Sequence, residues 1–200
     1  MNEAAHLDRL IGCLCRLPGV GRRSAERMAL KLARDPKGLL ADLAAALKEV
    51  GEKNCCCSRC GVITTVDKNP CRLCTDPRRD DAMLCVVEDA EDILPIERSM
   101  GFKGRYHSLM GKISPMRGQG PDDLRIDALL KRVDEGRFTE IILALNTDVE
   151  SDATASYISD LLKSRKVKVT RLAFGLPAGS GIMYSDAVTL ARAIKGRQAL

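Results

Sequence analysis

Hydrophobic residues follow a helical spacing in the first quarter of the chain. From Leu7 to Val50 they recur every three or four positions, which places them along one face of a helix. Pro18, Gly19 and Gly21 interrupt the first two helical segments, and residues 35–38 interrupt the second and third. The pattern predicts a small unit of three helices at the N-terminus.

From Ala82 onward, short runs of β-forming residues alternate with amphipathic segments. The expected strands are residues 83–87, 105–110, 141–145 and 167–172. The expected helices are residues 89–100, 122–135, 152–164 and 185–195. Strands that alternate with helices indicate crossover connections and a parallel sheet covered on both faces. The predicted fold class is therefore α/β with additional small domains.

Composition narrows the class of protein only slightly. Of the 200 residues, 45% are hydrophobic and 30% are charged, which is typical of a globular protein with its own core. No apolar run approaches the ~20 residues that a membrane span requires, and the first residues lack the order of a secretory signal. We expect a cytoplasmic protein with no membrane association. In a reducing compartment, clustered cysteines indicate metal binding more often than disulfides.

Six of the nine cysteines lie between Lys53 and Asp76, in a polar stretch without hydrophobic periodicity. Two pairs have the Cys-x2-Cys spacing, Cys57 with Cys60 and Cys71 with Cys74, and ten residues separate the pairs. Two such pairs supply the four thiolates of a structural Zn²⁺ site. The alternative is a set of buried or redox-active thiols. Cys55 and Cys56 stand beside Cys57 and could replace it as a ligand. The other three cysteines are expected to pack as small hydrophobic residues: Cys13, Cys15 and Cys85.

Charge is distributed unevenly along a chain whose formal net charge is +5. Residues 16–37 carry seven basic and two acidic side chains, whereas residues 76–92 carry seven acidic and two basic ones. In the basic stretch, Pro18-Gly19-Val20-Gly21 forms the turn of a predicted helix-hairpin-helix, and glycine lets a phosphate approach the backbone. Basic residues then follow one helix face, opposite Ala25, Met28, Ala29 and Leu32: they are Arg23, Arg27, Lys31 and Arg34. Together with Gly19 and Gly21 they predict a sequence-independent grip on DNA phosphates, although a basic face is also often merely solvated.

The order of these parts resembles the RecR family of bacterial recombination proteins over essentially the whole chain. The resemblance rests on "LPGVGRRSAERMA", "CTDPRRD", "LCVVEDAEDILPIE", "GRYHSLMGKISPMRGQGPDDL" and "DATASYISDLL". It implies a helix-hairpin-helix domain at 1–53, a zinc finger at 54–78, a Toprim domain at 79–172 and a C-terminal loop and helix at 173–200. It further implies a ring-shaped homotetramer, associated with the nucleoid, that binds single- and double-stranded DNA. Such proteins act with RecO and RecF as non-enzymatic mediators that help to load recombinase onto single strands.

The resemblance also assigns residues. It places Arg23 and Arg27 at positions linked to DNA binding, and it places Glu88, Asp92 and Glu150 at Toprim positions linked to RecO contact or function. Catalytic Toprim enzymes carry an Asp-x-Asp pair where this chain has Asn146-Thr147-Asp148.

Carboxylates at the ends of predicted strands leave the chemistry of the Toprim domain open. Glu88 ends one strand, and Asp148 and Glu150 follow another, where ligands bind in open α/β sheets. Our hypothesis is weak Mg²⁺ binding without DNA cleavage. The alternative is an acidic surface for a basic partner. Two rival functions are a Mg²⁺-dependent Toprim nuclease or primase-like enzyme, and a zinc-dependent scaffold that never contacts DNA.

Overall fold

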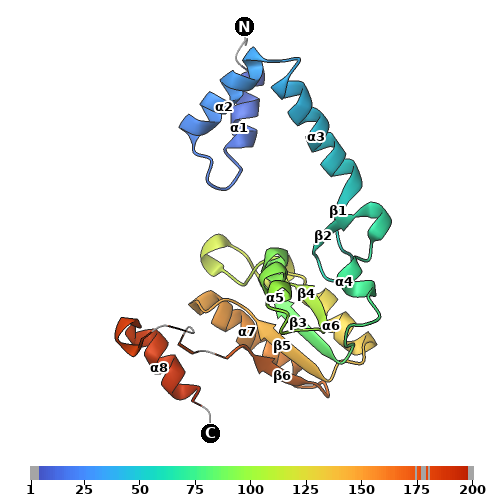
Figure 1. Cartoon of the computed structure of the whole chain (residues 1–200), viewed down its shortest axis with the longest axis vertical. Coiled ribbons are helices and arrows are strands. Elements are labelled where there is room, and N and C mark those ends of the chain that lie inside the picture. The colour runs from blue at the N-terminus through green and yellow to red at the C-terminus, as the bar shows by residue number, and fades with distance from the viewer. Residues whose placement is uncertain (1–4, 174, 177–178, 180, 198–200) are drawn as a thin grey trace. The chain divides into compact units, whose positions relative to one another are not determined.

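Three helices make up most of the first of two structural units, which ends at Cys55 in the computed structural model (Figure 1). The structure describes residues 5–173, 175–176, 179 and 181–197, so part of the loop before the last helix lies outside the described residues. The helices are α1 (Ala5–Leu14), α2 (Arg22–Arg34) and α3 (Leu39–Lys53). The prediction of a small N-terminal helical unit is therefore correct.

Helices α1 and α2 share the small core of this unit. Ile11 of α1 packs with Ala25 and Ala29 of α2, and the small alanines allow the two helices to lie close together. Met28, which was expected on the face opposite the basic residues together with these alanines, is 42% exposed. Helix α3 buries none of its residues.

The second unit, which begins at Cys56, contains a four-stranded parallel sheet. Its strands are β3 (Met83–Val87), β4 (Arg105–Ser108), β5 (Glu140–Ala144) and β6 (Lys168–Arg171), in the order β4-β3-β5-β6. The register sets Leu84 beside Arg105 and Ile141, and Ile141 beside Val169. All four predicted strands and their parallel arrangement are confirmed.

Side chains alternate between two hydrophobic clusters, one on each face of this sheet. Leu84 and Val86 join a cluster with α6 (Ile126–Glu135) and α7 (Val149–Leu162). Cys85 and Val87 join another with α5 (Ile93–Ser99). The face that α5 covers also receives Cys57, Cys60, Cys71 and Cys74 of the cysteine-rich stretch. The short elements of that stretch are β1 (Asn54–Cys56), β2 (Ile63–Thr65) and α4 (Arg72–Thr75).

Short 3-10 turns and one more helix complete the described elements. The turns are η1 (Val66–Lys68), η2 (Ala90–Asp92), η3 (Pro115–Arg117), η4 (Pro121–Asp123) and η5 (Ile182–Tyr184). Helix α8 (Ala187–Lys195) begins at Asp186, whose carboxylate accepts hydrogen bonds from the amides of Val188 and Thr189. No helix in the described part of the chain has both the length and the apolar character needed to cross a bilayer.

Candidate metal centre, Toprim carboxylates and nucleic-acid interface

The four predicted metal ligands lie together. The sulfur atoms of Cys57, Cys60, Cys71 and Cys74 are all within 4.8 Å of one another. Cys57 Sγ lies 3.9 Å from Cys74 Sγ, and Cys60 Sγ lies 3.4 Å from Cys71 Sγ. Zn–S bonds of about 2.3 Å in a tetrahedron require sulfur atoms about 3.8 Å apart, so the residues fit a zinc ion. Among the described residues, no other group of three or more potential ligands is close enough to share one ion.

The four cysteine side chains are buried, which favours a bound metal cation over free thiolates. All four cysteines are at most 4% exposed. Hydrogen bonds from Cys71 and Cys74, together with burial, raise the pKa of the Cys60 thiol. Four thiolates this close together would repel one another, and a cation between them would offset that repulsion. A bound zinc ion would supply that charge and would stabilise the fold, and four protein ligands leave no open position for catalysis.

The remaining cysteines lie outside the cluster. Cys55 and Cys56 lie on β1 and are half-buried and exposed, respectively, while Cys57 is buried with the other ligands. Cys85 packs in the core, as predicted, and burial raises the pKa of its thiol to about 12. Cys13 is exposed, so its predicted burial is wrong, because it lies on the side of α1 that faces away from α2.

The cysteine stretch is part of the core of the second unit. The stretch lacks hydrophobic periodicity, yet all four ligands share a buried cluster with Cys85, Val87 and Tyr106 of the sheet. Hydrogen bonds reinforce this packing. The Ser108 amide donates to the Cys60 carbonyl at 2.9 Å, and the Arg125 guanidinium donates to the carbonyls of Ser58 and Arg59 at 3.1 and 3.3 Å. The cysteine-rich stretch is therefore anchored directly on the parallel sheet.

Glu88, at the end of β3, is buried and fully hydrogen-bonded. Glu88 is only 3% exposed, and both of its carboxylate oxygens accept hydrogen bonds from Asn146. One bond comes from the Asn146 backbone amide at 2.7 Å and the other from Asn146 Nδ2 at 2.8 Å. An aspartate at position 146 would place a second carboxylate there instead of a donor. The amide that departs from the catalytic Asp-x-Asp pattern thus satisfies a buried carboxylate.

Lys112 provides the positive charge beside the other Toprim carboxylates. Its Nζ lies 2.5 Å from Asp148 Oδ2 and 3.8 Å from Glu150 Oε2, and the Lys112 side chain is 19% exposed. This hydrogen bond, with one from the Ser151 amide, lowers the pKa of Asp148 to about 2. Sequence reasoning missed Lys112, because a lone lysine in a loop carries no spacing signal.

The carboxylates of the other predicted Toprim residues also accept hydrogen bonds from neighbouring parts of the chain. Asp148 caps the N-terminus of α7 by accepting from the Ser151 amide at 3.0 Å. Glu150 accepts a hydrogen bond from the Ser114 hydroxyl at 2.5 Å. Asp92 accepts from the Asp89 amide at 3.0 Å and closes the turn η2. The structure therefore does not bring Glu88, Asp148 and Glu150 together as three ligands of one ion, within the residues that it describes.

The predicted hairpin turn leaves its backbone open to a ligand. Gly19 has φ +77°, a conformation that strains other residues, and Gly21 caps α2 with φ −79°. Apart from the adjoining backbone, no atom of the described residues lies within 4 Å of a Cβ built on either glycine. Within the described residues, no side chain caps the first amides of α2, so these amides remain available to an outside acceptor.

The basic row on α2 is exposed and unneutralised. None of Arg23, Arg27, Lys31 and Arg34 forms an ion pair within the described residues. The two nearby acids are engaged elsewhere. Glu26 pairs with Arg22 at 3.0 Å, and Asp35 accepts hydrogen bonds from the amides of Gly38 and Leu39. A uniform cationic face beside outward amides is suited to a polyanion.

The chain thus combines an open, cationic helical hairpin with a buried four-cysteine cluster and a four-stranded parallel sheet. Comparison with known families makes this specific. The family "RecR, helix-hairpin-helix" matches residues 7–50, "Toprim domain" matches 82–173 and "RecR, C-terminal" matches 175–198.

Curated relatives match along the whole chain. Recombination protein RecR of Moorella thermoacetica is 50% identical over 194 residues, which cover 97% of this chain and 96% of that protein. Recombination protein RecR of Thermobifida fusca is 50% identical over 200 residues, covering 100% of this chain and 99% of that protein. The chain belongs to the RecR family of recombination proteins, and its Toprim domain is of the RecR type. The family resemblance and the predicted α/β fold class are both confirmed.

Proposed function

We propose that this protein is a non-enzymatic recombination mediator, a DNA clamp that acts with RecO and RecF to help load recombinase onto single-stranded DNA during repair. The single observation that carries the proposal is the exposed row of Arg23, Arg27 and Lys31 beside the open glycine turn. Both features contact phosphates and neither reads bases, so binding is expected to be independent of sequence. Zinc in the four-cysteine site has a structural role in this proposal.

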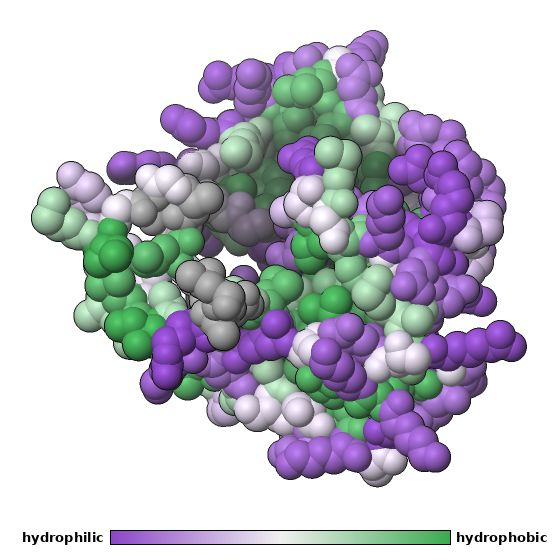
Figure 2. All heavy atoms as spheres, turned by 60° about the horizontal axis from the view of Figure 1, so that its bottom comes forward, coloured by the Kyte–Doolittle hydropathy of each residue, from purple (hydrophilic) through white to green (hydrophobic). Residues whose placement is uncertain are grey.

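Exposed apolar surface supports assembly into a homotetramer. Helix α3 carries Leu39, Leu43, Leu47 and Val50 with 38–65% exposure, at a spacing that keeps them near one face. In the C-terminal segment, Met183, Tyr184, Val188 and Ile194 are also at least 63% exposed. Figure 2 shows hydrophobic side chains gathered over this segment, at the left of the view. Surfaces of this kind are typical of subunit interfaces.

The acidic stretch supports contact with a basic partner such as RecO. Asp89 and Glu91 are exposed beside the half-buried Asp92, and burial with neighbouring acids raises the pKa of Asp89. Glu88 is buried, so we expect it to act by holding Asn146 in place and not by direct contact. Mg²⁺ binding at Glu88, Asp148 and Glu150 stays a prediction, and the Lys112 ammonium group beside Asp148 weighs against it.

The same geometry weighs against a nuclease or primase-like enzyme. Asn146 occupies the place of an acidic ligand, and Lys112 neutralises the carboxylates that a catalytic Mg²⁺ would need. We expect no cleavage or synthesis when the protein is incubated with labelled DNA and Mg²⁺. Turnover that disappears in Glu88→Ala would contradict the mediator proposal.

The DNA-binding part is tested by changing Arg23 and Arg27 to alanine together. Fluorescence anisotropy with single- and double-stranded oligonucleotides, across a range of salt, gives the affinity and its salt dependence. Each lost phosphate contact should reduce the slope of log affinity against log salt by about one, so the double variant should lose about two. Binding should weaken equally for unrelated sequences.

The matched control removes two lysines from the same unit. Lys48 and Lys53 lie on α3, where they pair with Glu52 and Glu49. The double variant Lys48→Gln with Lys53→Gln loses the same charge but should bind DNA with nearly the original slope. Equal weakening in both double variants would show that net charge alone governs binding, and unchanged binding in both would remove the hairpin from the proposal.

A further inference from the structure

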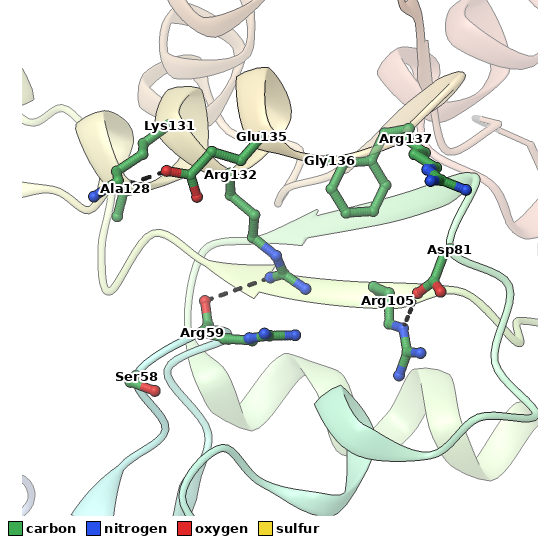
Figure 3. A pocket seen from close by; sticks show the side chains of 11 residues that line it. Ser58, Arg59, Asp81, Arg105, Ala128, Lys131, Arg132, Glu135, Gly136 and Arg137 are labelled. Atoms are coloured by element: carbon green, nitrogen blue, oxygen red, sulfur yellow. Dashed lines mark hydrogen bonds and ion pairs between the residues drawn. The ribbon is translucent and has the colours of Figure 1, made fainter.

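A cationic pocket lies between the zinc knuckle and the Toprim domain, within the second unit. Its volume is about 610 Å³, and its walls come from the knuckle, from β4 and from α6 with the turn that follows it. Figure 3 shows Arg132 reaching down from α6, Arg59 extending beneath it, and Arg105 beside Asp81. Three guanidinium groups from three separate elements therefore converge on one space.

Charge in this pocket is unbalanced. Five basic and two acidic residues line it: Arg59, Arg105, Lys131, Arg132 and Arg137, with Asp81 and Glu135. Both acids already have partners. Asp81 Oδ1 accepts from Arg105 Nε at 2.7 Å, and Glu135 pairs with Lys131 at 3.9 Å. Within the described part of the chain, Arg59, Arg132 and Arg137 have no carboxylate partner.

The two guanidinium groups at the floor are fixed in place and keep donors available. Arg105 is 7% exposed, and its Nη1 donates to the Leu73 carbonyl at 3.0 Å. Arg132 donates through Nη1 alone, to the carbonyls of Arg59 and Tyr106. The Nη2 atoms of Arg105 and Arg132 have no acceptor among the described residues. Carbonyl acceptors orient Arg132 without neutralising its charge, whereas Arg105 is held both by a carbonyl and by the Asp81 carboxylate.

The negative charge of a zinc-loaded cysteine site would balance part of the positive charge in this pocket, but not all of it. Burial lowers the pKa of Arg132, and the charge of Arg59 acts in the same direction, while the sulfurs of Cys74 and Cys60 oppose the shift. A zinc ion with four thiolates would retain two negative charges, against an excess of three positive charges in the pocket. Arg137, at the turn after α6, is exposed and has no acceptor among the described residues.

We propose that this pocket binds a phosphate group of a nucleotide, either free or within a DNA strand. Arginine forks on several sides suit a tetrahedral anion with oxygens in every direction better than a planar carboxylate with two. The volume exceeds that of a single phosphate and lies within the range of small-ligand sites, so a sugar and base fit beside it. The inference concerns the second unit alone and does not rest on DNA binding by the hairpin.

The test uses the full zinc-loaded chain and isothermal titration with inorganic phosphate and with dTMP. The variants are Arg59→Gln and Arg137→Gln, since both side chains are exposed and hold no backbone carbonyl. Arg98→Gln is the matched control, an exposed arginine on α5 away from the pocket. Each pocket variant should weaken dTMP binding by about tenfold, the value of one charge-assisted hydrogen bond, and the control should leave it unchanged.

A second arm identifies the source of the phosphate. In a background with Arg23 and Arg27 changed to alanine, residual binding of a thymidine oligonucleotide is compared with binding of dTMP. Residual oligonucleotide binding that Arg59→Gln abolishes assigns the pocket to DNA, and dTMP binding alone assigns it to a free nucleotide. The proposal is wrong if neither phosphate nor dTMP binds at millimolar concentration, if Arg98→Gln weakens binding as much as the pocket variants, or if a polyglutamate peptide binds more tightly than dTMP.

Discussion

At the scale of single residues, burial decides which side chains are chemically available. His107 is fully buried on β4, where Nε2 lies 2.9 Å from the Arg125 carbonyl and Nδ1 has no hydrogen-bond partner among the residues that the structure describes. Burial lowers the pKa of His107 to about 3, and the nearby charges of Arg125 and Arg132 act in the same direction. His107 therefore has a structural role, because an imidazole that is fully buried within the sheet cannot reach a substrate to exchange a proton with it.

The buried histidine should make stability depend on pH. In the unfolded chain His107 takes up a proton below pH ~6.5, whereas in the folded chain it does so only near 3. Stability should therefore fall as pH decreases from ~6.5, by up to about 1.4 kcal/mol per pH unit. Urea unfolding of zinc-saturated protein between pH ~7.5 and ~5.5 measures this slope. His107→Gln should be flatter over the same range, and parallel slopes would show that another group is responsible.

At the same scale, replacing Lys112 should change both the stability of the protein and its response to Mg²⁺. In Lys112→Gln the carboxylates of Asp148 and Glu150 lose their neighbouring cation, so stability should fall, within about 1 kcal/mol for such a partly exposed pair. The same change should create a site for a divalent ion. Millimolar Mg²⁺ should raise the Tm of the variant and leave the original chain unchanged. A Tm increase in the original chain that Asp148→Ala removes would instead establish the Mg²⁺ hypothesis.

At the scale of elements, the sequence predicted which helices and strands exist better than it predicted the residues at which they begin and end. Each strand was located from its β-forming run, but the expected strand 105–110 ends at Ser108, and Met110 adopts φ +62°. Helix α7 begins at Val149 and not at residue 152, because Asp148 supplies the cap. Helix α6 begins at Ile126 and not at 122, because Leu124 is extended and buried and the Arg125 amide donates to the Leu109 carbonyl. These boundaries depend on tertiary contacts that periodicity does not contain.

The two turn glycines should behave differently when each is changed to alanine. Gly19 has φ +77°, so Gly19→Ala should lower stability by about 1 kcal/mol. Gly21 has φ −79° and open space around it, so Gly21→Ala should fold with nearly unchanged stability. Its methyl group would nevertheless stand where a phosphate approaches the first amides of α2, and DNA affinity should fall. Thermal unfolding and anisotropy separate the two effects, and full DNA affinity in Gly21→Ala would argue against backbone contact at the turn.

At the scale of the whole molecule, the cysteine cluster belongs to the sheet as much as to its own loop. Its spacing identified all four ligands, but nothing in the sequence showed that they pack against Cys85 and Val87. The anchoring bonds from Ser108, Arg125 and Arg132 end on backbone carbonyls, which leave no pattern of side chains to recognise. Long-range contacts of this kind were the part of the site that could not be predicted from the sequence.

Loss of zinc should therefore loosen the Toprim sheet and not only the cysteine loop. In Cys60→Ser the site loses one thiolate, and Tm should fall by about 10 °C or more, since a structural zinc supplies several kcal/mol of folding free energy. Hydrogen exchange should accelerate in β3 and β4, which pack on the cluster, and stay unchanged in α1 and α2, which share no hydrophobic cluster with it. Cys56→Ser, an exposed neighbour outside the cluster, is the control. If exchange accelerates only between residues 57 and 74, the metal holds the loop alone and the sheet keeps its stability from the apolar residues around it.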